Sequence, residues 1–574
     1  MTKYVLDLEA DSLTPTRIWV VCICDVDCQN EKVLSFRDSS SFLQHVDIEN
    51  DTFIAHNGIG FDFPVLKDIW NIDIKNTVDT LVLSRLFHPD RVGGHSLDAW
   101  GERLVYHKMS FDKFDAYSEE MREYCEQDVS VTVKLYRHLV EEGSDFSQQS
   151  IDLEHSIATV IEGQSRYGFY LDKKKAVDLL VETQSKADSI KNNIKEYFPP
   201  KVKVIRKDLP KLTRSLAISK VGLRQFRYED VAGPFWSIEF EDFNPASHKQ
   251  VVERMNEAGW KPTEFTPKGS PRVCEANLAT LPDSAPKPAK KLSEWKMLET
   301  RWKTVESWLN ALGDDGRVHG KVFSLGAVTG RMTHADPNMA NIVSSSKPYG
   351  KESRECWTVP NEDYRICGMD AQGLELRMLA HYMKDDAYAE EVVNGDPHTV
   401  TMQALDITDR SLAKTFIYAF LYGASAAKLG SILKLNPSQG GAIRQRFLNN
   451  MPSLQNLIAR VDQVSSRGYI RGVDGRRLYV RHVHAALNTL LQGAGAILCK
   501  QWSVCMDRAI LKHNLRAKLV NTIHDELQFE VHKDDAKQVT ELAQSSIREA
   551  GHLLDLRVQM DAEAKIGFSW ADTH

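Results

Sequence analysis

The feature that most limits the fold of this chain occurs near both of its ends. Short apolar runs that finish at or near acidic residues alternate there with segments of helical periodicity. The apolar runs lie at 4–8, 18–24, 52–55, 364–369 and 518–523. Helical patterns lie at 61–70, 121–140, 409–422, 439–449 and 484–512. This alternation predicts an α/β class, α+β overall, and 574 residues exceed what one core usually holds, so we expect several domains.

The middle of the chain is different. Long helical patterns cover 151–164 and 173–197, and a third, rich in tryptophan, covers 292–312. Between them, at about 199–243, helical periodicity is lost and prolines appear, so we expect an inserted loop or small subdomain. The polar stretch at 141–150 is the best first boundary. We therefore predict three regions, at 1–150, 151–310 and 311–574.

Charge is unevenly distributed along the chain. The net charge is −7, but residues 1–150 hold 14 basic and 27 acidic side chains, whereas residues 401–500 hold 13 and 4. Residues 201–227 carry nine basic side chains against the single acid Asp208. The two basic segments are candidate phosphate-facing surfaces, and the alternative is that each is a solvated charged face.

Several classes of protein are disfavoured. Nine scattered cysteines with no CxxC pair argue against a disulfide framework and a zinc ribbon. The absence of a GxxxxGK[ST] loop argues against a nucleotide-driven motor. No apolar run is long enough for a membrane helix and two acids interrupt the first residues, so we expect an intracellular protein.

A set of acids marks the first region. Asp7 and Glu9 stand two apart in an apolar run, so on a strand their side chains share one face. Asp62 opens a helical pattern after a strand, and Tyr124 stands one helical turn before Asp128. Carboxylates gathered in this way suit hard divalent ions such as Mg²⁺. The alternative for acids at a strand end is ordinary solvated surface.

A second set lies in the last region. Arg410, Lys414, Tyr418 and Tyr422 recur every four residues and would form one stripe on a helix. Such a stripe suits a triphosphate and a nucleobase, and the alternative is an amphipathic helix with a basic edge. Asp370 ends one apolar run, and His524-Asp525-Glu526 lies between two others. Acids on neighbouring strands beside that stripe would form a two-metal site.

These segments resemble a known family. The segments 370–377, 410–423 and 524–526 are similar to motifs A, B and C of family A DNA polymerases. The segments 326–338 and 484–492 resemble the replicative polymerases of T-seven-like bacteriophages, and the acids of the first region resemble a DnaQ-like 3′–5′ proofreading exonuclease in its tyrosine form. The resemblance implies an RNase H-like exonuclease domain at 1–150, followed by a right-hand polymerase. Its thumb and linker would occupy 151–310, its palm and fingers 311–574, and its fingers about 397–475.

The resemblance also implies roles for residues of the polymerase site. Asp370 and Asp525 would hold two Mg²⁺ ions, which Mn²⁺ could replace. Arg410, Lys414 and His398 would bind the triphosphate, with Lys414 counted among the catalytic residues, and Tyr418 and Tyr422 would face the incoming nucleotide. Glu375 would exclude a ribose 2′-hydroxyl. Minor-groove contacts would come from Arg331, Asn488, Gln492 and His524.

In the exonuclease, the resemblance implies that Asp7, Glu9, Asp62 and Asp128 bind two metals and that Tyr124 orients the attacking water. The thumb insertion would hold duplex DNA through Lys201, Lys203, Arg206, Lys207, Lys211 and Arg214. Phage relatives recruit host thioredoxin at this place, but the insertion here is shorter, so the sequence leaves thioredoxin dependence open. Helicase-primase and single-stranded DNA-binding protein are further candidate partners, primer-template DNA and dNTPs are the expected substrates, and the cytoplasm of an infected bacterium is the expected location.

Two other readings remain open from the residues. A single-subunit RNA polymerase shares much of the metal and helix chemistry, but it would not be expected to carry the exonuclease acids or Glu375. A non-catalytic nucleic-acid scaffold would not need intact carboxylates at both places. The preference for deoxynucleotides over ribonucleotides separates the first reading from a DNA polymerase.

Overall fold

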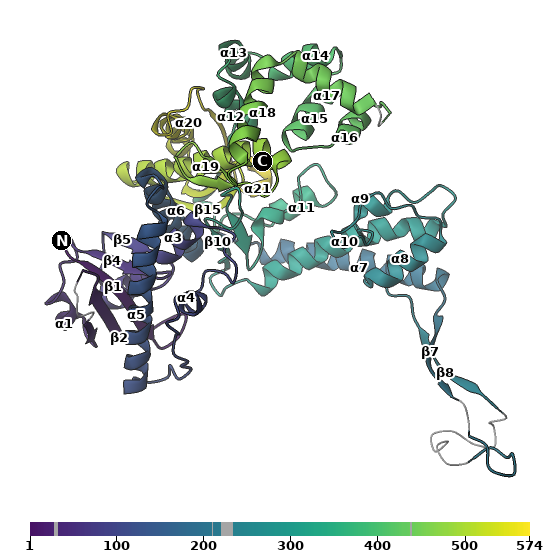
Figure 1. Ribbon diagram of the computed structural model, residues 1–574, viewed down its shortest axis with the longest axis horizontal. Helices are drawn as coiled ribbons and strands as arrows, with labels where there is room; N and C mark the ends of the chain where they lie inside the picture. Colours follow the sequence, from purple (N-terminus) through teal and green to yellow (C-terminus); the bar gives the residue numbers. More distant parts are fainter. Residues whose placement is uncertain (28–31, 209–210, 220–232, 437–438) are drawn as a thin grey trace. The chain divides into compact units, whose positions relative to one another are not determined.

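The protein is described by a computed structural model that covers residues 1–27, 32–208, 211–219, 233–436 and 439–574 (Figure 1). It divides into two compact units, one formed by 1–172 together with 311–574 and the other by 173–310. The first and last predicted regions therefore share one unit, and the helical pattern at 151–164 belongs with them. Within the described ranges, no helix combines the length and hydropathy needed to cross a bilayer.

The amino-terminal part is built on a five-stranded sheet with the order β3-β2-β1-β4-β5, in which β1 is antiparallel to β2 and parallel to β4. Its strands are β1 (Lys3–Ala10), β2 (Ile18–Asp25), β3 (Val33–Phe36), β4 (Thr52–Ala55) and β5 (Thr77–Asp79). Its helices are α1 (Ser39–Leu43), α2 (Asp62–Trp70), α3 (Thr80–Phe87), α4 (Leu97–Arg103) and α5 (Glu119–Glu142). Leu6 and Leu8 pack on one face of the sheet, whereas Val5 packs on the other against Met121 and Cys125 of α5. Apolar side chains therefore cover both faces of the sheet.

Buried charges join this part to the rest of the first unit. Helix α6 (Gln148–Tyr167) carries Glu154, which is fully buried and accepts hydrogen bonds from Arg476 and from Lys500, the latter at 2.6 Å. Nearby, Asp145 forms ion pairs with Arg471 and Arg477 of the short hairpin β13 (Tyr469–Arg471) and β14 (Arg477–Tyr479). These contacts explain why residues more than 300 positions apart belong to one compact unit.

The carboxyl-terminal part contains a four-stranded antiparallel sheet with the order β15-β16-β12-β17. Its strands are β12 (Tyr364–Ala371), β15 (Ala517–Ile523), β16 (Glu526–His532) and β17 (Ala562–Gly567). The helices packed near it are α12 (Leu374–Met383), α19 (Ala486–Lys512), α20 (Ala536–Leu553) and α21 (Trp570–Thr573). Shorter elements of this unit are β6 (Phe169–Tyr170), β9 (Arg317–Val318), β10 (Lys321–Phe323), β11 (Thr333–Ala335) and α11 (Gly350–Glu355).

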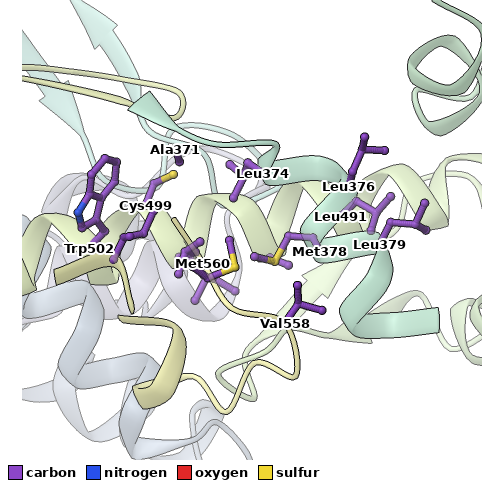
Figure 2. Packing of buried hydrophobic residues seen from close by; sticks show 14 of the residues in the cluster. Ala371, Leu374, Leu376, Met378, Leu379, Leu491, Cys499, Trp502, Val558 and Met560 are labelled. Atoms are coloured by element: carbon purple, nitrogen blue, oxygen red, sulfur yellow. The ribbon is translucent and has the colours of Figure 1, made fainter. Parts of the chain in front are cut away.

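An apolar cluster fixes α12 against α19 (Figure 2). Met378 and Leu379 of α12 lie beside Leu491 of α19, and Trp502 and Met560 extend the same cluster. Full burial of such a side chain stabilises the fold by about 1.5–3 kcal/mol. Because α12 begins just after β12 ends, this packing fixes the first turn of the helix next to the end of the strand.

A group of helices lies between α12 and α19 in the described part of the chain. They are α13 (Asp386–Asn394), α14 (Pro397–Leu405), α15 (Arg410–Leu421), α16 (Ala426–Ile432), α17 (Gly440–Asn449) and α18 (Pro452–Ser465). The predicted helix at 409–422 is confirmed as α15, and it starts where it does because the Asp409 carboxylate accepts hydrogen bonds from the amides of Ser411 and Leu412. The predicted helix at 439–449 is confirmed as α17.

The second unit pairs two long helices, α7 (Lys173–Tyr197) and α10 (Lys287–Asn310), with the shorter α8 (His248–Glu257) and α9 (Glu275–Leu278). The predicted insertion at 199–243 is an antiparallel hairpin of β7 (Lys201–Asp208) and β8 (Phe235–Glu241) in its described parts, and Figure 1 shows it leading away from the helices of this unit. Residues 209–210 and 220–232 of the insertion lie outside the described residues.

Candidate functional site

The antiparallel pairing of β12 with β16 brings two predicted acids together. Asp370 at the end of β12 lies opposite Glu526, the first residue of β16. Asp525 occupies the turn between β15 and β16, and its carbonyl accepts a 3.0 Å hydrogen bond from the amide of Ala371. The two aspartates are 155 positions apart in sequence and lie side by side at one end of the sheet.

The electrostatics of this pair suit a cation. Partial burial of Asp370, followed by the charges of Asp525 and Glu526, raises the pKa of its carboxyl to about 7. Burial, and then the charge of Glu375, also raises the pKa of Asp525. Because these carboxylates repel one another when ionised, a divalent ion between them would relieve the cost of their charge. The donor set therefore fits a metal ion.

Glu526 has different surroundings from its two neighbours. Its buried carboxylate accepts hydrogen bonds from Trp570 Nε1 at 2.6 Å and Gln528 Nε2 at 2.5 Å, and it lies 3.1 Å from His574 Nδ1. These contacts lower its pKa although burial alone would raise it. Glu526 is thus held by protein partners, whereas Asp370 is exposed at the end of β12 and Asp525 lines a cavity.

A cavity of about 350 Å³ lies next to Asp525. Five predicted site residues line it: Arg331, Glu375, Tyr422, His524 and Asp525. The structure adds residues that sequence reasoning missed, namely Met332, His334, Ala340, Leu374, Gly495, Ala496, Cys499 and Thr522. Most of these are small or apolar, and nothing in the local sequence distinguishes them from core positions.

One hydrogen bond fixes the acid in this cavity. The hydroxyl of Tyr422 donates to Glu375 Oε1 at 2.8 Å. Burial, then this carboxylate, raises the pKa of Tyr422 to about 12, so the hydroxyl stays protonated. Tyr422 follows the last residue of α15 and Glu375 lies in the first turn of α12, so the bond connects two helices across the cavity.

Helix α15 carries the predicted basic and aromatic stripe. Arg410 is paired in a bidentate manner with Asp396, at 2.7 Å and 3.0 Å, whereas Lys414 is exposed. The Tyr418 ring lies 6.2 Å from the ring of His398, whose buried Nδ1 has no hydrogen-bond partner among the described residues. Of the predicted minor-groove residues, Asn488 and Gln492 lie on α19 and are not among the residues that line the cavity.

The amino-terminal acids Asp7, Glu9, Asp62 and Asp128 form a second cluster. Asp7 and Glu9 project from β1, and ligand atoms of these two residues and of Cys125 lie within 4.8 Å of one another. The amide of Leu8, between them, donates to Asp62 Oδ1 at 3.2 Å, so Asp62 at the start of α2 reaches the same strand. Asp128 comes from α5, one turn after Tyr124.

These acids are crowded and desolvated. Burial first, and then the neighbouring carboxylates, raises the pKa of Asp7 well above its ordinary value and that of Glu9 to about 8. Burial also raises the pKa of Asp62 to about 7. Asp128 Oδ1 is buried without a hydrogen-bond partner in the described part of the chain. An unsatisfied buried carboxylate oxygen beside three other acids fits a site for divalent cations.

Sequence reasoning missed one member of this cluster, Lys108. Its ammonium lies 2.5 Å from Asp128 Oδ2 and 4.7 Å from the centre of the Tyr124 ring. Lys108 belongs to the segment between α4 and α5, which is neither helix nor strand. It stands 20 positions before Asp128 and shows no periodic relation to the acids, so no local signal indicates its role.

The β7–β8 hairpin does not present a purely basic surface. Lys201 is held by Glu253 and Glu257 of α8, each at 2.5 Å, and Lys203 lies opposite Glu239 in the strand register. The Lys207 ammonium lies 4.7 Å from the centre of the Trp236 ring. Acids thus balance part of the positive charge that the sequence predicted here. The face that carries Trp236 and Lys207 also carries the exposed apolar side chains of Val202, Val204, Ile238 and Phe240.

Comparisons with known proteins match the two parts of the chain that carry these clusters. A family model described as DNA polymerase family A matches residues 226–572, and one described as 3′-5′ exonuclease matches residues 4–144. The DNA-directed DNA polymerase of Enterobacteria phage T3 is 32% identical, over 99% of this chain and 100% of the relative, and that of Escherichia phage T7 is 31% identical with the same coverage. The POL domain of Pol1 from M. smegmatis, solved in complex with DNA primer-template and dNTP, has a TM-score of 0.77 and 19% identity, covering 99% of this chain and 95% of that one. That likeness concerns the fold.

Proposed function

The chain belongs to DNA polymerase family A and carries a 3′–5′ exonuclease domain, and on that premise we propose the roles of its residues in synthesis and in proofreading. It is a DNA-directed DNA polymerase whose two catalytic domains depend on metal ions. Synthesis takes place beside Asp370 and Asp525, and removal of 3′ nucleotides takes place at the amino-terminal acids. One observation carries the proposal: pairing of β12 with β16 puts Asp370 and Asp525 together next to a 350 Å³ cavity.

Asp370 and Asp525 would hold two Mg²⁺ ions in the polymerase site. Such ions would supply Lewis acidity to the primer 3′-hydroxyl and positive charge to the phosphate oxygens and the pyrophosphate leaving group. The protein contributes placement, because the sheet register fixes the spacing of the two carboxylates before any ligand arrives. Glu526, which is engaged by Trp570 and His574, supports the turn that carries Asp525.

Substrate dNTP enters along α15. Lys414, exposed on that helix, and His398, whose ring lies 6.2 Å from that of Tyr418, contact the triphosphate. Arg410 joins them by exchanging the Asp396 carboxylate for phosphate oxygens, since both ligands offer the same bidentate geometry. Tyr418 faces the sugar and base. On the cavity side, Glu375 occupies the space that a ribose 2′-hydroxyl would need, and the Tyr422 hydroxyl holds it there.

In the exonuclease site, Asp7, Glu9, Asp62 and Asp128 would hold Mg²⁺, which would supply the charge that lowers the pKa of an attacking water. Tyr124, on α5, directs its hydroxyl toward that water. The acidic character of residues 1–150, with 27 acidic against 14 basic side chains, disfavours duplex and leaves only a frayed single strand close to the metals.

One assay tests both sites. A primed template is extended with dNTPs and Mg²⁺, and the nucleotides are then withdrawn. We expect extension followed by trimming of the 3′ end, with Asp525→Ala abolishing the first and Asp7→Ala the second. Incorporation of ribonucleotides in preference to deoxynucleotides would support an RNA polymerase instead. Trimming that persists in Asp7→Ala would contradict the exonuclease assignment.

The β7–β8 insertion contacts duplex DNA through its predicted basic side chains other than Lys201, which two glutamates of α8 hold. A second role for it is recruitment of host thioredoxin, favoured by the exposed apolar face of Val202, Trp236 and Phe240. Deleting residues 201–227 should shorten the product made per binding event and weaken its salt dependence. Adding thioredoxin to the intact chain separates the two roles, because only recruitment predicts longer products. Replication of phage DNA in an infected bacterium, with helicase-primase and single-stranded DNA-binding protein, is the setting that we propose.

A further inference from the structure

We propose that Lys108 is a positioning residue of the exonuclease, which holds the Tyr124 hydroxyl and the Asp128 carboxylate in the arrangement that hydrolysis requires. The inference rests on the exonuclease function proposed above and extends it to a residue outside the acid and tyrosine set. Its starting point is geometric. One ammonium group lies 2.5 Å from Asp128 Oδ2 and 4.7 Å from the centre of the Tyr124 ring.

The contacts of Lys108 decide the direction of the Tyr124 hydroxyl. The ammonium has only donor hydrogens, so beside the phenol oxygen it can only donate. The Tyr124 hydroxyl therefore keeps its own hydrogen for an acceptor, and the structure places the Asp128 carboxylate beside it. Water or a phosphodiester that enters the site competes with Asp128 for that hydrogen. Lys108 thus keeps Tyr124 a hydrogen-bond donor toward Asp128 and the reacting groups.

Lys108 also supplies positive charge where the site is most acidic. The charge of Lys108 opposes the rise in the pKa values of three neighbouring carboxylates, those of Asp7, Glu9 and Asp128. Its side chain is 24% exposed, whereas that of Asp128 is 4% exposed, so Lys108 lies on the solvent side of the acid. A phosphodiester that reaches the site therefore finds an accessible ammonium group beside the carboxylates, which reduces its repulsion.

The segment that carries Lys108 is anchored rather than free. Gln127 Nε2 of α5 donates to the carbonyl of His107 at 2.9 Å, and Trp19 Nε1 of β2 donates to the carbonyl of Phe114 at 2.9 Å. Phe111 packs 5.5 Å from the Tyr124 ring. These contacts fix the segment that carries Lys108 against β2 and against α5, the helix that carries Tyr124. Such second-layer support is typical of residues that orient a reacting group.

The main experiment is a double-mutant cycle between Lys108→Met and Tyr124→Phe. Single-turnover removal of the 3′ nucleotide is measured on a single-stranded oligonucleotide with Mg²⁺. We expect Lys108→Met to slow this step by about 10- to 100-fold, in the range found when a preorganised donor is removed. In the Tyr124→Phe chain, the same substitution should cost clearly less than in the wild type, because the part of its effect that acts through Tyr124 is already lost. Equal costs in both backgrounds would overturn the proposal.

Two comparisons complete the test. Lys113→Met changes an exposed lysine of the same segment and should retain the wild-type rate, and Lys108→Arg should restore part of the activity. Binding of Mn²⁺ is measured by calorimetry in the Asp525→Ala chain, where the polymerase site lacks one ligand. We expect Lys108→Met to leave the affinity unchanged or tighter, since the ammonium competes with the cation for Asp128. Loss of Mn²⁺ binding would show that Lys108 shapes the metal site instead.

Failure of this inference and failure of the exonuclease assignment give different results. If Asp7→Ala trims DNA as the wild type does, the acid cluster is not the nuclease site, whatever Lys108 does. If Asp7→Ala is inactive and Lys108→Met retains the wild-type rate within twofold, the assignment stands and the role of Lys108 is refuted. Thermal denaturation of each variant identifies substitutions that act by unfolding the domain.

Discussion

The hydrogen bond from Tyr422 to Glu375 should set how strongly the polymerase rejects ribonucleotides. Tyr422→Phe removes only the hydroxyl that donates to Glu375 Oε1 at 2.8 Å. The carboxylate then gains rotameric freedom and can move away from an incoming 2′-hydroxyl. Its contribution to excluding ribose therefore weakens, while the phenyl ring keeps its place beside the cavity.

The expected size follows from the kind of bond. A hydrogen bond to a charged group contributes about 1.5–3 kcal/mol, and because Tyr422 is 46% exposed the lower end applies. About 1.4 kcal/mol corresponds to a factor of ten. We therefore expect the ratio of kcat/KM for a dNTP to that for the matching rNTP to fall about tenfold in Tyr422→Phe.

The assay is single-nucleotide insertion on one primed template, with each dNTP and rNTP measured separately. Glu375→Ala should reduce the ratio further than Tyr422→Phe does, because it removes the carboxylate itself. Tyr388→Phe is the matched control, since the Tyr388 hydroxyl has no hydrogen-bond partner among the described residues. A ratio that stays within twofold of wild type in Tyr422→Phe, together with a large loss in Glu375→Ala, would show that Glu375 holds its position without the tyrosine.

Three further predictions concern other parts of the molecule. The family resemblance implies that Tyr418 lets the enzyme accept dideoxynucleotides, so Tyr418→Phe should increase discrimination against them in a chain-termination assay; strong rejection by the wild type would contradict this. Glu154→Ala leaves the buried Arg476 without one of its acidic partners and should lower the free energy of unfolding of the first unit by about 3–5 kcal/mol. Denaturant unfolding measures this loss. A loss smaller than about 1 kcal/mol would show that water replaces the carboxylate as partner of Arg476. Glu9, whose pKa is raised to about 8, lowers the stability of the metal-free protein as pH rises from about 4.5 to 8, because the folded state binds the proton more tightly than the unfolded state does. In EDTA, Glu9→Gln should therefore melt at a higher temperature than wild type at pH 8 and at the same temperature at pH 4.5, and an equal shift at both pH values would exclude titration as the cause.

The sequence by itself determined the features that depend on local periodicity. The two-residue spacing of Asp7 and Glu9 predicts a shared strand face, and the four-residue spacing of Arg410, Lys414 and Tyr418 predicts a stripe on α15. The helix predicted at 173–197 has the bounds of α7, since its apolar repeat runs without interruption between two breaks. Local geometry is encoded in neighbouring residues, so it can be read from them.

Tertiary structure decided which distant groups meet. No repeat in the sequence relates Asp370 to Asp525, and only the antiparallel register of β12 and β16 makes them neighbours. The same holds for Lys108, which reaches Asp128 through an irregular segment, and for Lys201, which two glutamates of α8 neutralise. Charge counts along a chain treat side chains as independent. Their effect in the protein depends on partners that folding brings from elsewhere, because electrostatic interactions act through space and not along the sequence.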